Sequence, residues 1–425
     1  MMNKKAKITE KRNSIFQKIL LPLDSSPHSN YSISRALEIG KRFDSLLVAT
    51  HVYAARLHED RFKEMETGLP AKYQKEEELE RQRDLHGDLI DKGLRLISDS
   101  YFSEFAKGCQ ELGINHEGKN IEGKNFAEIA KEVKTGEYDL VIMGALGLGA
   151  VEHSIIGTVC ERVVREVRSD CLVVKEDRPF GGDILVAVDG SPSSFWGIKV
   201  AMYLKRVFGG EIEAISVFDP YFHQVAFKSI AGILSEEASN VFKFEEQEKL
   251  HDEIIDKGLA KIYQDQLNKA GRIAEREGVE IKTTLLAGKP YNEIIKHLSW
   301  KKYSVLVTGR QGIHSNGLDL GGNTENLLRM APCNIIIASR EYNDIPEEVG
   351  VDGISKDKVV WDDDTIKRLD KIPFFARGMA KKAIEDFARE KGTTSVTDEI
   401  FDTAAKKILP SSARGAMGIE EEAGE

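Results

Sequence analysis

Short runs of apolar, mostly β-branched residues recur through the first 340 positions of the chain. Such runs are typical of strands buried on both faces, as in a parallel sheet. Segments with apolar residues at helical spacing, such as residues 31–43 and 126–133, separate them. This alternation predicts doubly wound α/β sheets with right-handed crossovers. The expected strands are residues 19–23, 46–53, 114–121, 139–143 and 171–174, followed by 184–188, 212–218, 279–286, 305–308 and 335–338.

The chain also repeats itself, which indicates a duplicated domain. Residues 85–97 read LHGDLIDKGLRLI and residues 250–262 read LHDEIIDKGLAKI, with eight of thirteen positions identical at an offset of 165. The offset predicts two tandem five-stranded parallel α/β domains, at residues 14–178 and 181–340. The same offset maps Asp24, Gly144, Gly147 and Gly157 onto Asp189, Gly309, Gly312 and Gly322.

A long, charged, helix-forming insert follows the second strand of each copy, at residues 58–112 and 225–276. Charge runs of this kind are usually solvated helix faces. We expect the repeated LH-x-x-[LI]-IDKGL stretch to be the packed part of each insert. A partner surface shared by the two copies is the alternative.

The candidate binding site lies at the carboxyl ends of the strands, where open parallel sheets bind ligands. Asp24 follows the first strand, and Gly144-Ala-Leu-Gly147 follows the strand at 139–143. Nine residues later, Gly157-Thr158 opens a helical segment. Glycines let the backbone approach a phosphate, and a helix N-terminus directs free N–H groups at it. A carboxylate at the end of the first strand can accept from an adenine amino group or a ribose hydroxyl.

The second copy keeps the pattern with changes. Gly309-Arg-Gln-Gly312 is followed by nine residues and then Gly322-Asn323, so Asn323 stands where the first copy has Thr158. We expect the Asn323 amide or the Thr324 hydroxyl to replace the missing donor. Asp319 in this loop would repel an anion unless a metal bridged the two.

With these motifs the chain resembles the universal stress protein family, whose domain is a five-stranded, Rossmann-like parallel sheet. The spacing G-x2-G-x9-G-[ST] is the signature of its ATP-binding branch. In copy one the resemblance implies contacts to adenosine from Pro22, Asp24 and Val52, to ribose and phosphates from Met143, Gly144 and Gly147, and to phosphates from Gly157, Thr158 and Val159. In copy two, which matches less well, the corresponding residues are Asp189, Val217, Gly309, Gly312, Gly322, Asn323 and Thr324.

The loop at residues 145–156 contains no Lys or Arg, so the charge of a bound phosphate needs another partner. Arg162 and Arg165 on the following helix are the nearest cations. Alternatively, both arginine side chains lie on a solvated face of that helix.

The last part of the chain predicts a small helical module. We expect a linker at residues 341–360, a three-helix module at 361–409 and a disordered tail at 410–425. The module, above all KIPFFARG at 371–378, resembles the small helical C-terminal domain found in light-independent protochlorophyllide reductase. We interpret it as a docking or regulatory addition for an unknown protein partner, with contact to a tetrapyrrole or redox partner as the alternative.

Composition narrows the classes of function. The net charge of −10 argues against nucleic-acid and anionic-membrane binding, since both need a basic surface. No apolar run approaches the ~18–20 residues that span a bilayer, and the first thirteen residues are polar and basic, unlike a secretory signal. The four cysteines form no CxxC pair, so we expect free thiols in a reducing cytoplasm.

Together these features predict an ATP-binding stress-response or regulatory protein, with or without Mg²⁺, whose occupancy biases its conformation or its partners. No nucleophile–base pair is recognisable, so at most slow ATP hydrolysis is expected. We expect the repeats to pack as an intramolecular pseudo-dimer, with further homo-oligomers open. The alternative is an interaction scaffold that binds no nucleotide and attaches the C-terminal module to a redox or tetrapyrrole-related complex. An oxidoreductase would need a G-x-G-x-x-G after a first strand, and neither copy has one.

Overall fold

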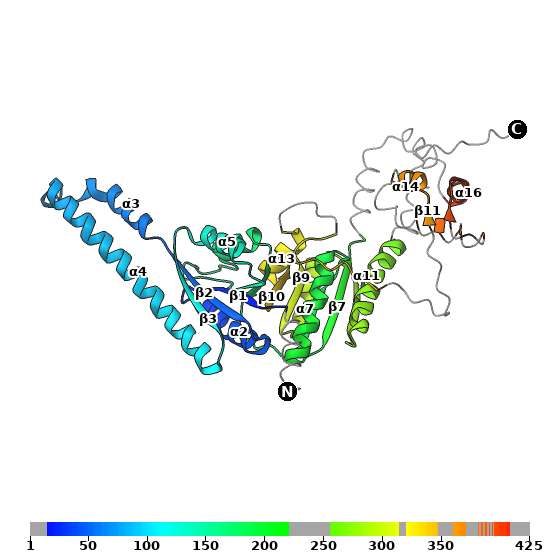
Figure 1. Cartoon of the computed structure of the whole chain (residues 1–425), viewed down its shortest axis with the longest axis horizontal. Helices are drawn as coiled ribbons and strands as arrows, with labels where there is room; N and C mark the ends of the chain where they lie inside the picture. The colour runs from blue at the N-terminus through cyan, green and yellow to red at the C-terminus, as the bar shows by residue number, and fades with distance from the viewer. Residues whose placement is uncertain are drawn as a thin grey trace, which may run out of the picture. The chain divides into compact units, whose positions relative to one another are not determined.

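The chain forms two compact units, residues Met1–Pro346 and Glu347–Glu425 (Figure 1). The computed structural model describes residues 15–220, 256–313, 320–346 and, with gaps, 360–408. Each unit is considered by itself below.

The first unit contains two α/β repeats, which confirms the predicted fold class. Every predicted strand is present, with its ends shifted by a few residues at most. The first repeat consists of β1 (Lys18–Pro22), α2 (Pro27–Phe43), β2 (Leu46–Tyr53), α3 (Ala55–Met65), α4 (Glu76–Leu112), β3 (His116–Glu122), α5 (Asn125–Gly136), β4 (Leu140–Gly144), α6 (Thr158–Glu166) and β5 (Asp170–Val174). The second consists of β6 (Ile184–Ala187), α7 (Pro192–Phe208), β7 (Ile212–Phe218), α11 (Asp256–Arg276), β8 (Lys282–Ala287), α12 (Pro290–Trp300), β9 (Val305–Gly309), α13 (Gly322–Met330) and β10 (Asn334–Ala338).

The strands form one ten-stranded sheet in the order β3-β2-β1-β4-β5-β10-β9-β6-β7-β8. Within each repeat the strands are parallel, and the repeats join through the antiparallel pair β5–β10, where Val173 lies opposite Ile335. From each outer edge inward, equivalent strands of the two repeats therefore follow in the same order. In each repeat the strand order reverses direction at the first strand, and such a switch point leaves a crevice at the carboxyl ends.

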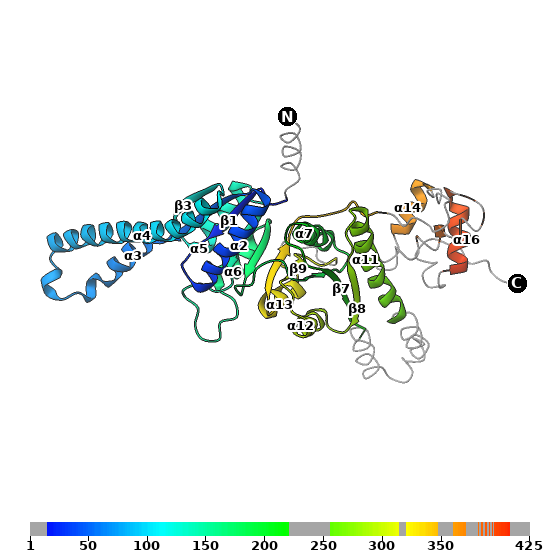
Figure 2. The ribbon, with the colours of Figure 1, turned by 90° about the horizontal axis from the view of Figure 1, so that it is seen from below.

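Apolar cores fill both faces of the sheet because the strands alternate between them. On one face α2, α7 and α11 cover strand residues such as Ile19 and Leu21. On the other face α5, α6, α12 and α13 cover neighbours such as Leu20 (Figure 2). Both cores run across the β5–β10 pair, so the repeats share them.

The hairpin of α3 and α4 extends away from the sheet (Figure 1). Phe105 and Cys109 near the end of α4 are buried, but Leu85, Leu89 and Leu96 are 54%, 68% and 70% exposed. The expectation that the repeated stretch is the packed part of the insert is therefore wrong in the first repeat. The stretch lies on the half of α4 that reaches beyond the sheet and contacts α3 instead. In the second repeat, residues 221–255 lie outside the described part.

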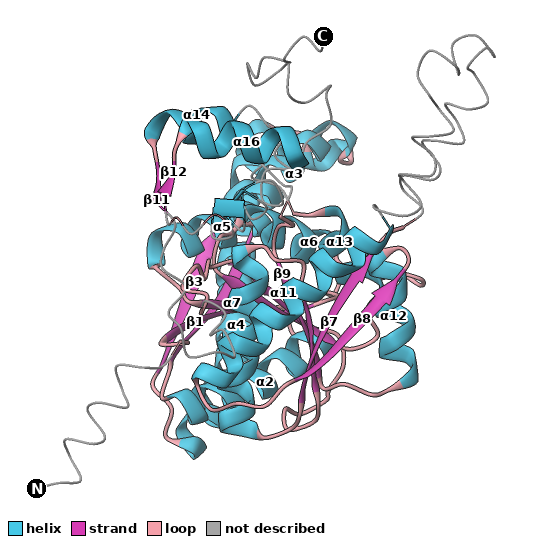
Figure 3. Cartoon of the chain, turned by 90° about the vertical axis from the view of Figure 1, so that its right-hand side faces the viewer, coloured by secondary structure: helices cyan, strands magenta, loops and turns pink. Residues whose placement is uncertain are grey.

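The C-terminal unit builds its own small core around Leu369, Ile384, Phe387 and Phe401. Its elements are β11 (Val360–Trp361), α14 (Asp363–Asp370), β12 (Ser395–Val396) and α16 (Asp398–Ile408) (Figure 3). Thr397 opens α16 as predicted, since its carbonyl accepts from the N–H of Phe401 at 2.8 Å. The parallel pair β11–β12 was not predicted, because two-residue strands leave no periodic pattern. Residues 371–378, the tail and most of the linker lie outside the described residues.

Candidate functional site

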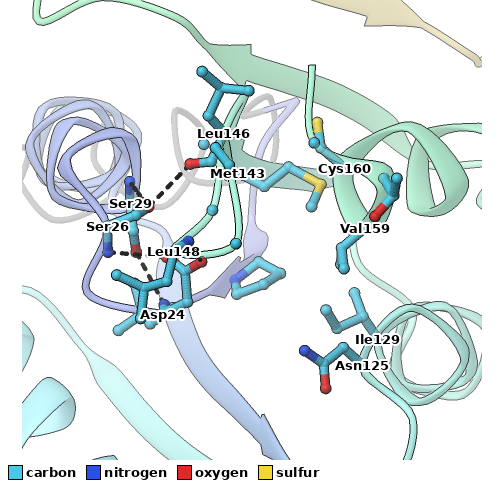
Figure 4. Close-up of a pocket in the computed structure, with 18 of the residues that line it drawn as sticks. Asp24, Ser26, Ser29, Asn125, Ile129, Met143, Leu146, Leu148, Val159 and Cys160 are labelled. Carbon is cyan, nitrogen blue, oxygen red and sulfur yellow. Dashed lines mark hydrogen bonds between the residues drawn. The ribbon is translucent and has the colours of Figure 1, made fainter. Parts of the chain in front are cut away.

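A cavity of about 460 Å³ lies at the carboxyl ends of β1 and β4 in the first repeat (Figure 4). We name it cavity one. All nine residues predicted for copy one line it: Pro22, Asp24, Val52, Met143, Gly144, Gly147, Gly157, Thr158 and Val159. The sequence thus identified the walls of a single cavity from four segments distant in the chain.

Asp24 holds the glycine-containing loop against the end of β1. Its Oδ1 accepts from the N–H of Ser26 at 3.0 Å, and its Oδ2 accepts from the N–H of Leu148 at 3.1 Å (Figure 4). Ser26 adds a second link, because its hydroxyl donates to the carbonyl of Leu146 at 3.0 Å. A Cβ at Gly147 would lie 2.5 Å from Asp24 Oδ2, so a larger residue here would displace the carboxylate from the loop. The carboxylate predicted to contact the nucleoside therefore already binds the loop.

The first turn of α6 faces cavity one with backbone donors. Gly157 is its N-cap and, having no side chain, makes no capping hydrogen bond, while its own N–H donates to the carbonyl of Ala145 at 2.7 Å. A Cβ at Gly157 would meet that same carbonyl oxygen at 3.2 Å. The hydroxyl of Thr158 is on an exposed residue at the cavity wall. This geometry suits an anion, since N–H groups and the positive end of the helix dipole point the same way.

The opposite wall is mainly apolar, with Pro22, Val52, Ile129 and Met143. His51 lies beside it and its Nδ1 is 2.7 Å from the hydroxyl of Ser98. Burial lowers the pKa of His51, so this ring is neutral at neutral pH and adds no charge to the cavity. An apolar wall facing a polar turn is the arrangement expected for a ligand with one apolar and one anionic end.

The two arginines suggested as phosphate partners are engaged elsewhere. Arg165 pairs with Glu325 of the second repeat at 2.6 Å and with Glu161 at 3.3 Å. Arg162 lies over the ring of Phe126, 4.7 Å from its centroid. Neither residue lines cavity one, so the structure does not support that suggestion.

Cavity two, of about 420 Å³, occupies the corresponding place in the second repeat. All seven residues predicted for copy two line it: Asp189, Val217, Gly309, Gly312, Gly322, Asn323 and Thr324. Asp189 accepts from the N–H groups of Ser191 at 3.0 Å and Ile313 at 3.2 Å, as Asp24 does in the first repeat. The aspartate that holds the loop is therefore common to both repeats.

The predicted equivalence of Gly157 with Gly322 is wrong. The N-cap of α13 is Gly321, whose N–H donates to the carbonyl of Arg310 at 3.0 Å. The second loop is one residue shorter, so Gly322 takes the place of Thr158 and supplies no hydroxyl. Gly321 and Gly322 are adjacent, so the sequence allows Gly157 to be aligned with either of them. Residues 314–319 of this loop lie outside the described part.

The expected substitution of Thr158 by Thr324 is wrong for the same reason. Thr324 is buried, and its hydroxyl donates to the carbonyl of Gly309 at 2.7 Å. Asn323 is exposed at the cavity wall. Cavity two thus has a helix N-terminus but lacks the hydroxyl of cavity one.

Sequence reasoning missed the side chains that distinguish the two cavities. Asn125 at the start of α5 lines cavity one, and Pro290 stands there in cavity two. Tyr263 of α11 lines cavity two, whereas Ser98 occupies the corresponding position in the first repeat. Comparison of the two aligned copies could have identified these positions.

Among the described residues, no group of three His, Cys, Asp or Glu side chains is placed to hold a metal ion. No helix in this part of the chain is both long and apolar enough to cross a bilayer.

Two family models match the chain. The one described as "Universal stress protein family" matches residues 15–175 and 182–339. The one described as "Proto-chlorophyllide reductase 57 kD subunit" matches residues 361–404.

The chain is also similar to individual universal stress proteins. A putative universal stress protein of Staphylococcus saprophyticus is 27% identical over 187 residues, covering 42% of this chain and 96% of the relative. A universal stress protein of Methanocaldococcus jannaschii is 26% identical over 165 residues, covering 39% of this chain and 85% of the relative. The crystal structure of a universal stress protein from Archaeoglobus fulgidus aligns with a TM-score of 0.50 at 17% identity, covering 77% of this chain and 99% of that chain.

Proposed function

The chain belongs to the universal stress protein family, and from this premise we propose that it binds ATP in cavity one and that occupancy biases its conformation or its choice of partner. One observation carries the proposal. The loop from Gly144 to Gly147 and the uncapped first turn of α6 form a backbone surface for an anion beside an apolar pocket. A nucleoside triphosphate has both of the complementary parts.

The residues of cavity one divide between these two parts. Pro22, Val52 and Met143 would enclose the adenosine, and the backbone at Gly147, Gly157 and Thr158 would hold the phosphates. None of the side chains that line the cavity, all of them described, belongs to Lys or Arg. We therefore propose that Mg²⁺ accompanies the nucleotide and offsets its charge.

Cavity two supports weaker binding. Asp189 and the helix N-terminus at Gly321 are present, but Gly322 offers no hydroxyl where the first repeat has Thr158. One lost hydrogen bond to a charged group corresponds to about 1.5–3 kcal/mol, or roughly a tenfold or larger weakening. We expect no enzymatic turnover beyond slow ATP hydrolysis in either cavity.

The test is direct binding of ATP–Mg²⁺ to the full chain by isothermal titration calorimetry. Thr158→Ala should weaken binding about tenfold or more, because it removes one hydrogen bond to a charged group. Gly157→Val should weaken it more, because its Cβ would meet the carbonyl of Ala145. The exposed Thr135→Ala variant, on the distal end of α5, is the matched control and should bind as the wild type does.

An interaction scaffold that binds no nucleotide is the second candidate. The match at residues 361–404 and the separate core around Phe401 favour a C-terminal unit with a docking role. Two results together would favour this candidate: no adenine nucleotide released from the denatured protein, and no thermal shift with ATP–Mg²⁺. A cytoplasmic location stays a prediction, with which the four buried free thiols are compatible.

A further inference from the structure

The helix that faces cavity one is held at its other end by the second repeat. α6 has nine residues and is about 13 Å long at 1.5 Å per residue. The guanidinium of Arg310 donates to the carbonyls of Val164, at 2.6 Å, and Arg165 in the last turn of α6. Arg310 is 2% exposed and lies between Gly309 and Gly312, in the loop of cavity two. One side chain therefore connects the loop of the second cavity to the helix of the first.

The reverse connection is made by a different residue. Lys175 directly follows β5 of the first repeat, and its Nζ donates to the carbonyls of Arg329 at 3.2 Å and Ala331 at 2.7 Å. These carbonyls end α13, whose first turn lines cavity two. In each cavity-facing helix, two carbonyls at the C-terminal end are thus bound by a cation from the opposite repeat.

Duplication alone does not account for this exchange. Ala145 stands in the first repeat where the second has Arg310, since both carbonyls accept from the N-cap glycine of the next helix. Ser339 stands in the second repeat where the first has Lys175. The N–H of Lys175 donates to Asn334 and that of Ser339 to Asp170, the first residues of the paired strands. Arg310 and Lys175 therefore occupy positions that are not equivalent in the two repeats, yet both bind carbonyls at the end of a helix in the opposite repeat.

We propose that each nucleotide cavity is completed by the other repeat: Arg310 positions α6 for cavity one, and Lys175 positions α13 for cavity two. The last four carbonyls of a helix have no partner within it, and a cation placed there fixes the end and complements the dipole. A nine-residue helix moves as a unit, so a released last turn displaces the first-turn N–H groups. This inference rests on the proposed nucleotide binding.

The ion pairs on the surface of the same interface do not substitute for these contacts. Arg165 with Glu325, and Arg329 with Glu161, also link α6 to α13. Their side chains are 22–39% exposed, and exposed ion pairs contribute little. Arg310 and Lys175 instead bind main-chain carbonyls at the helix ends.

The test uses the full chain with Arg310→Met and Lys175→Met, which remove the charge and approximately keep the volume. Photolabelling with 8-azido-ATP, followed by mass spectrometry of the labelled peptides, reports the occupancy of each cavity separately. We expect Arg310→Met to weaken cavity one about fivefold or more, and Lys175→Met to weaken cavity two to a similar degree. Each variant should affect the cavity of the opposite repeat more than its own. Arg310→Lys and Lys175→Arg should restore most of the affinity.

A purely structural role would give a different pattern. If Arg310 and Lys175 had only a structural role, each Met variant would weaken most the cavity of the repeat that carries the substitution, or both cavities in proportion to the loss in thermal stability. Either result overturns the proposal. Should a Met variant fail to fold, Arg310→Gln and Lys175→Gln are compared with the Lys and Arg variants by the same criterion. Wild-type protein that labels neither cavity contradicts the nucleotide proposal itself, whereas labelling that is normal in all variants contradicts only the exchange of cations.

Discussion

The carboxylate of Asp24 accepts a hydrogen bond from the main-chain N–H of Leu148 at 3.1 Å, across 124 positions of the sequence. The carboxylate of Asp189 does the same with Ile313 at 3.2 Å. Both aspartates also accept from a serine N–H two residues later, so both Oδ atoms are engaged. The strand-end aspartate is thus a part of the loop as well as a candidate ligand contact.

Asp24→Asn should therefore loosen the loop of cavity one. An amide offers one acceptor oxygen where the carboxylate offers two, so the bond to Leu148 or to Ser26 is lost. Hydrogen bonds to charged groups contribute about 1.5–3 kcal/mol, which predicts roughly tenfold weaker ATP binding or more. Hydrogen exchange of the Leu148 amide should become faster, while cavity two stays unchanged. Tighter ATP binding with unaltered exchange would indicate that charge repulsion, and not loop support, is the main effect of Asp24.

Gly322→Thr should strengthen cavity two. Gly322 is the first residue of α13, where the first repeat has Thr158, and a Cβ there meets nothing within 4 Å. The new hydroxyl restores one donor to a charged group, which predicts about tenfold tighter nucleotide binding in that cavity. Asn323→Thr is the matched control, because the alignment by an offset of 165 would instead make position 323 the effective one. Improvement at 323 and none at 322 would refute the shorter-loop alignment.

The pH dependence of cavity two follows from Lys175. Burial lowers the pKa of Lys175 from 10.5 to about 8. The neighbouring groups that act on it are the thiols of Cys160 and Cys333, whose own pKa values are raised by burial, so these stay neutral in the same range. Between pH 7 and 9 the cation at the end of α13 is lost, and nucleotide affinity of cavity two should fall while that of cavity one stays constant.

The stability of the fold should change in the opposite direction to the nucleotide affinity as Lys175 loses its proton. The unfolded chain still binds the proton between about pH 8 and 10.5, while the folded chain has released it, so the Lys175 contribution to stability rises with pH across that window. Affinity and stability changing in opposite directions would separate this effect from general alkaline unfolding. Lys175→Arg, which keeps its charge, should abolish the pH dependence of cavity two, and persistence of that dependence would assign it to another group.

The sequence predicted those features that depend on local pattern. Apolar runs located all strands of both repeats, and the glycine spacing with Asp24 located cavity one. The loop alignment at Gly321 was missed because two neighbouring glycines satisfy either spacing. Arg310 and Lys175 could not be assigned, because each contacts main-chain carbonyls about 150 positions away. Carbonyls carry no side-chain signature, so only the pairing of β5 with β10 reveals these contacts.

The junction between the repeats should depend strongly on Asp170. This fully buried carboxylate begins β5 and accepts from Arg340 at 2.7 Å, from the N–H of Ser339 at 2.7 Å and from the indole of Trp196 at 2.9 Å. All three partners belong to the second repeat. Asp170→Ala leaves these donors without their acceptor, and removing one partner of a buried ion pair costs about 3–5 kcal/mol.

Chemical unfolding in urea, followed by tryptophan fluorescence, measures this loss. Arg340 is one-third exposed, so the lower end of that range is expected. Asp88→Ala, which removes an exposed ion pair with Lys92 on α4, is the matched control and should change the free energy of unfolding by less than about 1 kcal/mol. If the repeats fold as one cooperative unit, Asp170→Ala shifts a single transition to lower urea. A new transition for one repeat alone, with the other unaffected, would mean that the shared sheet does not couple their folding.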